Sequence, residues 1–170
     1  MPLIRHDLMP FCRDPINLLA LGFGSGLARR APGTFGTLAG IPFLPLFGLM
    51  TLPWASSLLL VAVLAGVLIC GHASRSMGLE DPGCVVWDEM VGLWVTLYAL
   101  PLTFSAVVGG FLLFRLFDIL KPWPISWCDR TVKGGLGIMV DDLLAGLFAG
   151  LLLRVLLWVT GQVPQILFLG

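Results

Sequence analysis

Long uncharged stretches of the chain alternate with short segments that hold most of its charged residues. No Asp, Glu, Lys or Arg occurs between residues 31 and 74 or between residues 90 and 114. Within the first stretch, residues 54–70 form a predominantly apolar run that approaches the length of a membrane span. Residues 38–50 are also apolar but contain two prolines, which predicts a kinked or only partly inserted segment.

The second uncharged stretch allows two topologies. A single span over residues 90–114 would put the charges before and after it on opposite sides of the bilayer, whereas a hairpin broken at Pro101 would return them to the same side. Pro101, followed by Thr103 as a helix N-cap, favours two helices over about residues 88–100 and 103–121. We therefore predict the hairpin.

Composition places the chain among membrane proteins. Of its 170 residues, 58% are hydrophobic and 12% are charged, compared with about 45–50% and about 25% in soluble domains. With a last helix over about residues 139–160, these patterns predict a single domain over residues 1–170: an all-α, multi-pass membrane helical bundle with short or re-entrant helices. The net charge is zero and no basic patch is present, so nucleic-acid binding has no support.

On the hairpin topology, nearly every charge lies on one face of the membrane. The positive-inside rule assigns that face to the cytoplasm, which predicts a polar site there. The cations concerned are Arg5, Arg13, Arg29, Arg30, Arg75, Arg130 and Lys133. Arg154 is the exception, because it lies within the last helix; snorkelling to the interface and pairing with a carboxylate are both open to it.

Two acidic pairs, Asp88–Glu89 and Asp141–Asp142, each stand at the expected start of a long apolar helix. The helix dipole explains one acid at a helix N-terminus, but four carboxylates beside lipid would repel one another. A bound divalent cation would remove this repulsion. Because a ligand set of oxygens without His or Cys suits Mg²⁺ better than zinc, we predict that both pairs hold Mg²⁺.

The segment between the two acidic pairs carries further candidate groups. Arg115, Asp118 and Lys121 follow one another at helical spacing and gather on one side of a helix that Pro122 ends. Alone, each has an ordinary explanation as a salt bridge or a helix-terminal charge. Beside acids that hold a metal, the two cations are expected to bind phosphate.

Two glycine-containing segments are candidates for anion-binding loops. Residues 133–137, with Lys133 and three glycines, precede the last helix, and residues 31–34 end in the hydroxyl of Thr34. Glycine lets backbone N–H groups approach an anion, although membrane helices also use glycine for close packing. Close packing is the expected role of Gly92, Gly146 and Gly150.

Four motifs, in order, resemble the phosphatidylglycerophosphatase A family of bacterial membrane lipid phosphatases. They are GFGSGL…APGTFGT at residues 22–37, VWDEMVG at 86–92, FRLFDILKPWPI at 114–125 and GGLGIMVDDLLAG at 134–146. The resemblance covers about residues 17–150. It implies a Mg²⁺-dependent enzyme of the bacterial inner membrane that converts phosphatidylglycerophosphate to phosphatidylglycerol and inorganic phosphate, with its active site facing the cytoplasm.

The resemblance and the residue pattern together give each polar group an expected role. Asp88, Glu89, Asp141 and Asp142 are expected to hold Mg²⁺, and Asp118 or Asp129 to orient the attacking water or accept its proton. Lys121 is expected to neutralise charge on the transferred phosphoryl group. The expected phosphate ligands are Thr34, Arg115, Lys121, Arg130 and Lys133.

Two alternatives stay open at this point. A covalent aspartyl-phosphate is the rival to direct attack by water, and a membrane transporter or ion-coupled carrier is the alternative function, because membrane carboxylates also line ion paths. The predicted partners are the lipid substrate and the surrounding membrane lipids. The sequence leaves the oligomeric state open.

Overall fold

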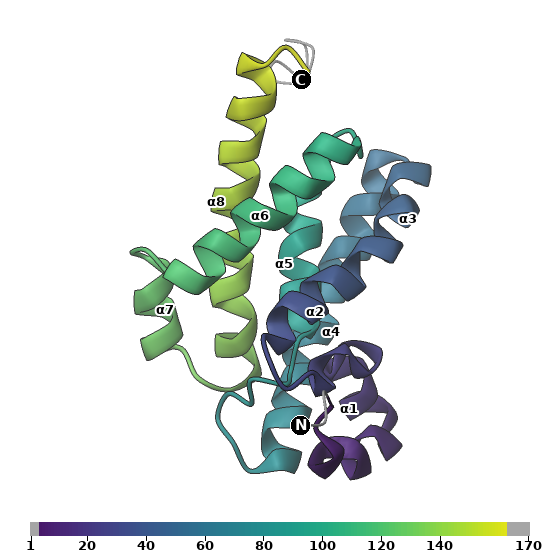
Figure 1. Cartoon of the computed structure of the whole chain (residues 1–170), viewed down its shortest axis with the longest axis vertical. Coiled ribbons are helices and arrows are strands. Elements are labelled where there is room, and N and C mark those ends of the chain that lie inside the picture. Colours follow the sequence, from purple (N-terminus) through teal and green to yellow (C-terminus); the bar gives the residue numbers. More distant parts are fainter. Residues whose placement is uncertain (1–3, 163–170) are drawn as a thin grey trace.

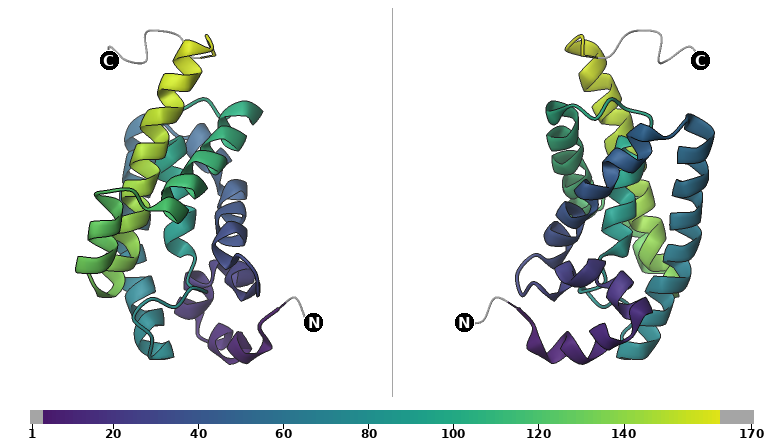
Figure 2. Two further views of the ribbon diagram at one scale, coloured as in Figure 1. Left: turned by 60° about the vertical axis from the view of Figure 1, so that its left-hand side comes forward. Right: turned by 90° about the vertical axis from the view of Figure 1, so that its right-hand side faces the viewer.

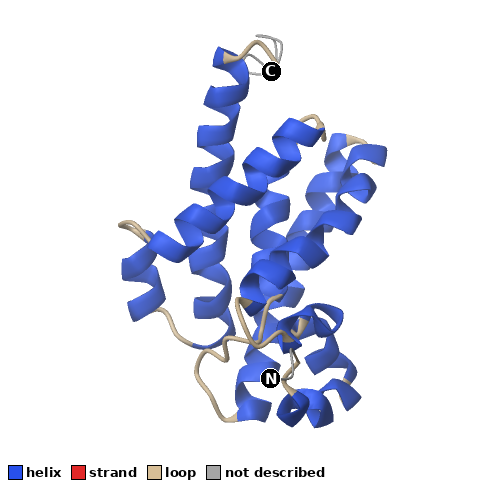
Figure 3. Ribbon diagram, in the orientation of Figure 1, coloured by secondary structure: helices blue, strands red, loops and turns tan. Residues whose placement is uncertain are grey.

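A computed structural model describes residues 4–162, and within them every regular element is a helix (Figure 3). The predicted all-α fold is thereby confirmed. In chain order the elements are η1 (His6–Arg13), α1 (Pro15–Ala20), η2 (Gly22–Leu27), α2 (Pro32–Gly40), η3 (Ile41–Phe43), α3 (Leu44–Leu49), α4 (Leu52–Met77), α5 (Trp87–Leu97), α6 (Phe104–Leu120), α7 (Ile125–Thr131) and α8 (Gly134–Val159).

The bundle is organised around α5 and α8. The long helix α8 packs against α5, α6 and α4, while α2 covers another side of α5 (Figure 1). The central position of α5 is reflected in its side chains, since Met90, Val91 and Leu93 are fully buried. The short helices η1, α1 and η2 gather near the end of the molecule where α4 finishes (Figure 2).

The predicted hairpin around Pro101 is confirmed. Helix α5 ends at Leu97 and α6 begins at Phe104, after a connection that contains Pro101. Thr103 caps α6, because its hydroxyl oxygen accepts a hydrogen bond of 3.2 Å from the backbone N–H of Ala106. Helix α6 then runs back toward the end at which α5 began (Figure 1). The charges that flank the uncharged stretch therefore lie at the same end of the bundle.

Helix α4 is longer than the sequence pattern predicts. It starts at Leu52 and continues to Met77, so that it extends beyond the predicted run of residues 54–70 at both ends and includes His72. His72 makes a hydrogen bond of 2.7 Å to Asp14, the N-cap of α1. This bond, together with one from the backbone N–H of Ile16, holds the pKa of Asp14 below its usual range. His72 thus ties the N-terminal segment to the bundle.

Helix α8 also starts earlier than expected, at Gly134 instead of near Met139. The predicted glycine loop is therefore wrong: its residues form the first turn of α8. The reason is packing, because a Cβ on Gly135 would collide with the backbone carbonyl of Val67 in α4. Asp141 and Asp142 consequently lie about two turns inside α8 rather than at its start.

Glycines let α5 and α8 approach closely, as expected for Gly92, Gly146 and Gly150. A Cβ on Gly146 would collide with the carbonyl oxygen of Gly92, and a Cβ on Gly150 would lie 2.8 Å from the carbonyl oxygen of Thr96. Side chains of any size would separate the two backbones. This contact fixes how the polar residues near the start of each helix face one another.

Three segments are long and apolar enough to cross a membrane: residues Pro32–Leu49, Leu52–Met77 and Gly134–Val159. The first is interrupted by η3, in line with the predicted kink at its prolines. Exposed tryptophans mark both ends of the bundle, with Trp54 near the start of α4, Trp158 near the end of α8, Trp123 just before α7 and Trp127 within α7. Such residues are typical of membrane interfaces.

Replacing Gly146 by valine should force α5 and α8 apart. We expect the variant to lose about 1–3 kcal/mol of stability, because the added side chain meets backbone that cannot move aside. Thermal unfolding in detergent micelles measures the change. The matched control is Gly83→Ala, where a Cβ has no neighbour within 4 Å. Equal unfolding midpoints for Gly146→Val and the parent would contradict the close contact.

Candidate active site

Three carboxylates from two helices meet at the end of the bundle where α5 begins. Asp88 and Glu89 lie in the first turn of α5, and Asp142 lies in α8. One carboxylate oxygen from each residue lies within 4.8 Å of the other two. Gly92 and Gly146 each follow the acids by one turn, so the close approach of α5 and α8 brings these side chains together. We refer to Asp88, Glu89 and Asp142 as the carboxylate cluster.

The carboxylate cluster is nearly closed to solvent. Asp88 is 9% exposed and Asp142 is 3% exposed, and the neighbouring Asp141 is 7% exposed. Four buried oxygens accept no hydrogen bond from any described residue; they are Asp88 Oδ1, Glu89 Oε2, Asp141 Oδ1 and Asp142 Oδ2. Such oxygens are costly to bury, but they are the ligands that a hard divalent cation prefers. The donor set is therefore of the kind that Mg²⁺ takes.

Lys121 connects three helices beside the cluster. It adopts a left-handed backbone conformation (φ 42°) at the end of α6. Its ammonium group donates hydrogen bonds of 2.6 Å to Asp129 of α7 and to Asp141 of α8. Burial opposes the charged form, but the two carboxylates outweigh it, so the pKa of Lys121 lies above its ordinary value. Lys121 is a fixed positive charge at this site.

Arg115 supplies the second positive charge, on the α6 side of the cluster. Its Nη1 lies 2.5 Å from Asp118 and 3.8 Å from Glu89. The Arg115 side chain is only 14% exposed, and its buried Nε–H has no hydrogen-bond partner among residues 4–162. An anion that reached the cluster would find this donor free.

The first turn of α2 closes the site next to Arg115. A Cβ on Gly33 would collide with the Glu89 carboxylate and would lie 3.0 Å from Nη1 of Arg115. Thr37 fixes this turn, since its hydroxyl donates a hydrogen bond of 2.8 Å to the carbonyl of Gly33. Thr34 follows Gly33 and is half-buried. The loop predicted here is thus a helix start.

A small polar pocket of about 60 Å³ opens beside Asp141 and is also lined by Asp129 and Lys133. Lys133 is exposed and lies 3.5 Å from Glu80 in an ion pair. Arg130, by contrast, is exposed on α7 and does not line the pocket. The structure therefore brings Lys133 to the edge of the site and leaves Arg130 on the outer surface.

The structure gathers most of the predicted site residues but divides the acids between two roles. Asp88, Glu89 and Asp142 share the cluster, whereas Asp141 turns to Lys121. The sequence placed Gly33 in a candidate anion-binding loop, but its close approach to the Glu89–Arg115 pair was not predicted. The sequence signal for this contact was a glycine directly after Pro32 at a helix start. Because glycine has a low helix propensity, its presence in a helix indicates a need for close packing.

In comparisons with known proteins, one family model and two relatives that carry the same description match the chain. The family model described as phosphatidylglycerophosphatase A matches residues 18–157. The chain is 49% identical to phosphatidylglycerophosphatase A of Escherichia coli (strain K12) over 144 residues, which cover 82% of each protein. It is 44% identical to the protein of the same name from Haemophilus influenzae over 141 residues, covering 80% of the chain and 85% of that relative.

A third relative carries a different description. The chain is 41% identical over 152 residues to a putative phosphatidylinositol-3-phosphatase of Bacteroides thetaiotaomicron, and the match covers 85% of the chain and 94% of that relative. No solved structure matches the chain.

Removing the charge of Lys121 should destabilise the protein more than removing that of Lys133. Lys121→Met leaves Asp141 buried without its cation, and we expect a loss of about 1–3 kcal/mol. Lys133→Met removes an exposed ion pair worth about 0–1 kcal/mol. Thermal unfolding of both variants measures the difference. Equal stabilities would mean that the Lys121–Asp141 pair makes no net contribution.

Proposed function

Since the chain belongs to the phosphatidylglycerophosphatase A family and is a phosphatase, we propose that it hydrolyses phosphatidylglycerophosphate to phosphatidylglycerol and inorganic phosphate in a Mg²⁺-dependent reaction. The observation that carries the proposal is the carboxylate cluster, placed beside Arg115 and Lys121 at one end of an apolar bundle. Phosphoryl transfer requires this combination, because cations must balance the charge of the transferred group while water is positioned.

In this proposal Asp88, Glu89 and Asp142 hold Mg²⁺. Support comes from their mutual distances and from the buried oxygen that each leaves without a hydrogen bond. Asp141 also has such an oxygen, so it is a further candidate ligand while its other oxygen stays with Lys121. When bound, a divalent ion supplies Lewis-acid polarisation of a phosphoryl oxygen.

Arg115 and Lys121 bind the phosphate in the proposed reaction. The Nε–H of Arg115 is buried and free to donate, and Lys121 stays protonated because two carboxylates hold it. Thr34 and Lys133 stand at the edges of the site and could complete the binding of the headgroup. Arg130 lies outside this arrangement, so we assign it no direct contact.

Asp118 is the better placed of the two candidate acids to orient the attacking water. It pairs with Arg115, whose Nη1 also lies 3.8 Å from Glu89 of the carboxylate cluster. Asp129 lies on the other side of Lys121 and faces the polar pocket. Because Arg115 holds the Asp118 carboxylate in an ion pair, Asp118 would act mainly by positioning the water.

The lipid part of the substrate has a suitable place next to the cluster. An apolar cleft of about 340 Å³ runs between α3 and α4 and reaches Trp87, which precedes Asp88. An acyl chain in this cleft would let the substrate stay in the bilayer while its phosphate enters the site. We propose that this site faces the cytoplasm from the bacterial inner membrane, since most of the Lys and Arg residues lie toward this end.

A carrier function is disfavoured by where the charges lie. Ion-coupled carriers place carboxylates near the membrane midplane, whereas here Asp88, Glu89 and Asp142 all lie toward the end of the bundle where α5 and α8 begin. The relative described as a putative phosphatidylinositol-3-phosphatase indicates a second substrate to be tested, phosphatidylinositol 3-phosphate.

Release of inorganic phosphate from phosphatidylglycerophosphate tests the proposal. The purified protein should be active with Mg²⁺, inactive after chelation, and at least about 10²-fold slower as Asp142→Asn. Asp7→Asn, which alters an exposed acid of η1, is the matched control and should keep the parent rate. Faster hydrolysis of phosphatidylinositol 3-phosphate would correct the substrate. Full activity of Asp142→Asn would defeat the proposed metal site.

Rapid-quench kinetics in a single turnover separate the two mechanisms. Direct attack by water predicts that phosphatidylglycerol and inorganic phosphate form at one common rate, since a single step produces both. An aspartyl-phosphate predicts that phosphatidylglycerol is released first and that substrate-derived phosphate is found on the protein. We expect the common rate, because the carboxylates of the site are committed to neighbouring cations or to the proposed metal.

A further inference from the structure

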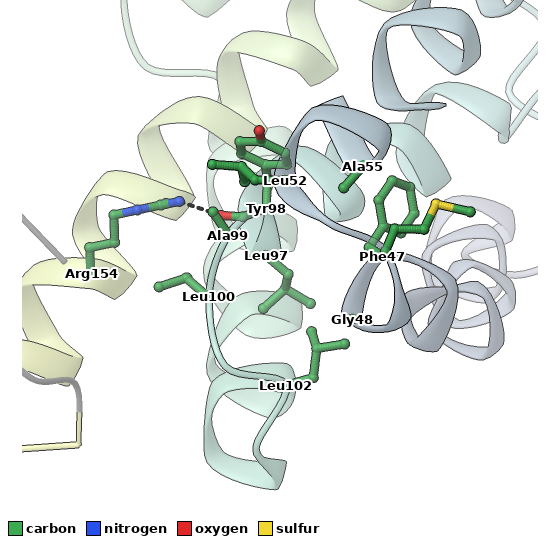
Figure 4. A pocket seen from close by; sticks show the side chains of 11 residues that line it. Phe47, Gly48, Leu52, Ala55, Leu97, Tyr98, Ala99, Leu100, Leu102 and Arg154 are labelled. Carbon is green, nitrogen blue, oxygen red and sulfur yellow. Dashed lines mark hydrogen bonds between the residues drawn. The ribbon is translucent and has the colours of Figure 1, made fainter. Parts of the chain in front are cut away.

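A second pocket lies at the end of the bundle opposite the carboxylate cluster. Its volume is about 690 Å³, within the range of ligand-binding sites. It is bounded by α3, the start of α4 and the connection between α5 and α6, with Arg154 of α8 at its edge (Figure 4). The lining is otherwise mostly aliphatic or aromatic, with Phe47, Leu52, Leu97 and Leu100 among its residues.

Among the residues that line this pocket, Arg154 alone is charged. No other Asp, Glu, Lys or Arg follows Asp142, and none occurs between residues 31 and 74 or between residues 90 and 114. Among residues 4–162, no carboxylate forms an ion pair with Arg154. The sequence left open whether Arg154 pairs with a carboxylate. In the structure its partners are backbone carbonyls instead.

The guanidinium of Arg154 is only partly used by the protein. It donates one hydrogen bond to the carbonyl of Gly150, at 3.1 Å, and one to the carbonyl of Tyr98 (Figure 4). A guanidinium has five N–H donors, so donors are left over beside the pocket. A half-buried positive charge without a counter-charge is costly, and an anion from outside the chain would compensate it.

The position of Arg154 along α8 indicates where that anion comes from. Asp142 and Arg154 are separated by 12 residues, a rise of about 18 Å. Trp158 lies one turn further on, and Trp54 is exposed at the start of α4. Because exposed tryptophans favour the headgroup region, Arg154 lies on the side of the bundle that faces the second interface of the bilayer, and its long side chain can reach toward phosphates there by snorkelling.

We propose that this pocket binds a membrane phospholipid from the leaflet opposite the active site, with its phosphate on Arg154 and part of an acyl chain against the apolar lining. Arginine suits this role, because its planar fork donates two parallel hydrogen bonds to a phosphate. The combination of one cation without a carboxylate partner and an apolar pocket at the far end of the bundle matches an amphipathic anion. This lipid is distinct from the substrate, which the proposed function places at the other end of α8.

Native mass spectrometry of the delipidated protein with added dioleoylphosphatidylglycerol tests the assignment. The parent should retain one tightly held lipid, and Arg154→Gln should retain it about tenfold or more weakly. Arg154→Lys, which keeps the charge but loses the fork, should fall between them. Arg75→Gln is the matched control, because this arginine is exposed near the other end of α4. Dioleoylglycerol, which lacks the phosphate, should not be retained.

Gly48→Leu provides an independent test in which Arg154 is unchanged. A Cβ at position 48 would make ordinary contact with Leu102 at 3.4 Å, so the added side chain fits but occupies the pocket. Gly48→Leu should lower lipid retention to a degree similar to that of Arg154→Gln. If Arg154→Gln does not fold, Gly48→Leu alone tests whether the pocket binds the lipid. Parent-like retention by these variants, equal retention of dioleoylglycerol, or displacement of the lipid by inorganic phosphate would overturn the proposal.

Discussion

The candidate site gathers six buried or partly buried carboxylates and two partly buried cations near one end of an apolar bundle. The acids are Asp88, Glu89, Asp118, Asp129, Asp141 and Asp142, and the cations are Arg115 and Lys121. If all are ionised, six negative charges against two positive charges leave an excess of four. Such an excess would repel a phosphate. In the proposed function, a bound cation would offset this repulsion.

This concentration of charge is possible because the helix backbones lie close together. Gly92 and Gly146 bring α5 against α8, and Gly33 brings the start of α2 against Glu89. Each of these glycines belongs to a motif that resembles the phosphatase family, and each acts through the absence of a side chain. The motifs thus combine ionisable residues with the packing residues that hold them at short distance.

The hairpin and the meeting of the acidic pairs were predictable, because Pro101 and Thr103 act locally on the backbone. The start of α8 could not be predicted, because glycines are equally typical of loops and of close helix packing. The separate roles of Asp141 and Asp142 depend on the rotation of α8. Adjacent residues of a helix point about 100° apart, so one faces α6 and the other α5. Only the packed structure fixes that rotation.

Helix α5 explains why charged groups are kept at both ends of this bundle. With 11 residues it is about 16 Å long, too short to cross a bilayer core of about 30 Å. Its ends therefore lie inside the bundle, where unpaired backbone groups are costly. Asp88 and Glu89 complement the positive end of its dipole, and Arg154 binds the Tyr98 carbonyl at the negative end. Helix α8 carries both Asp142 and Arg154, so one rigid element links the active site to the far end of the bundle.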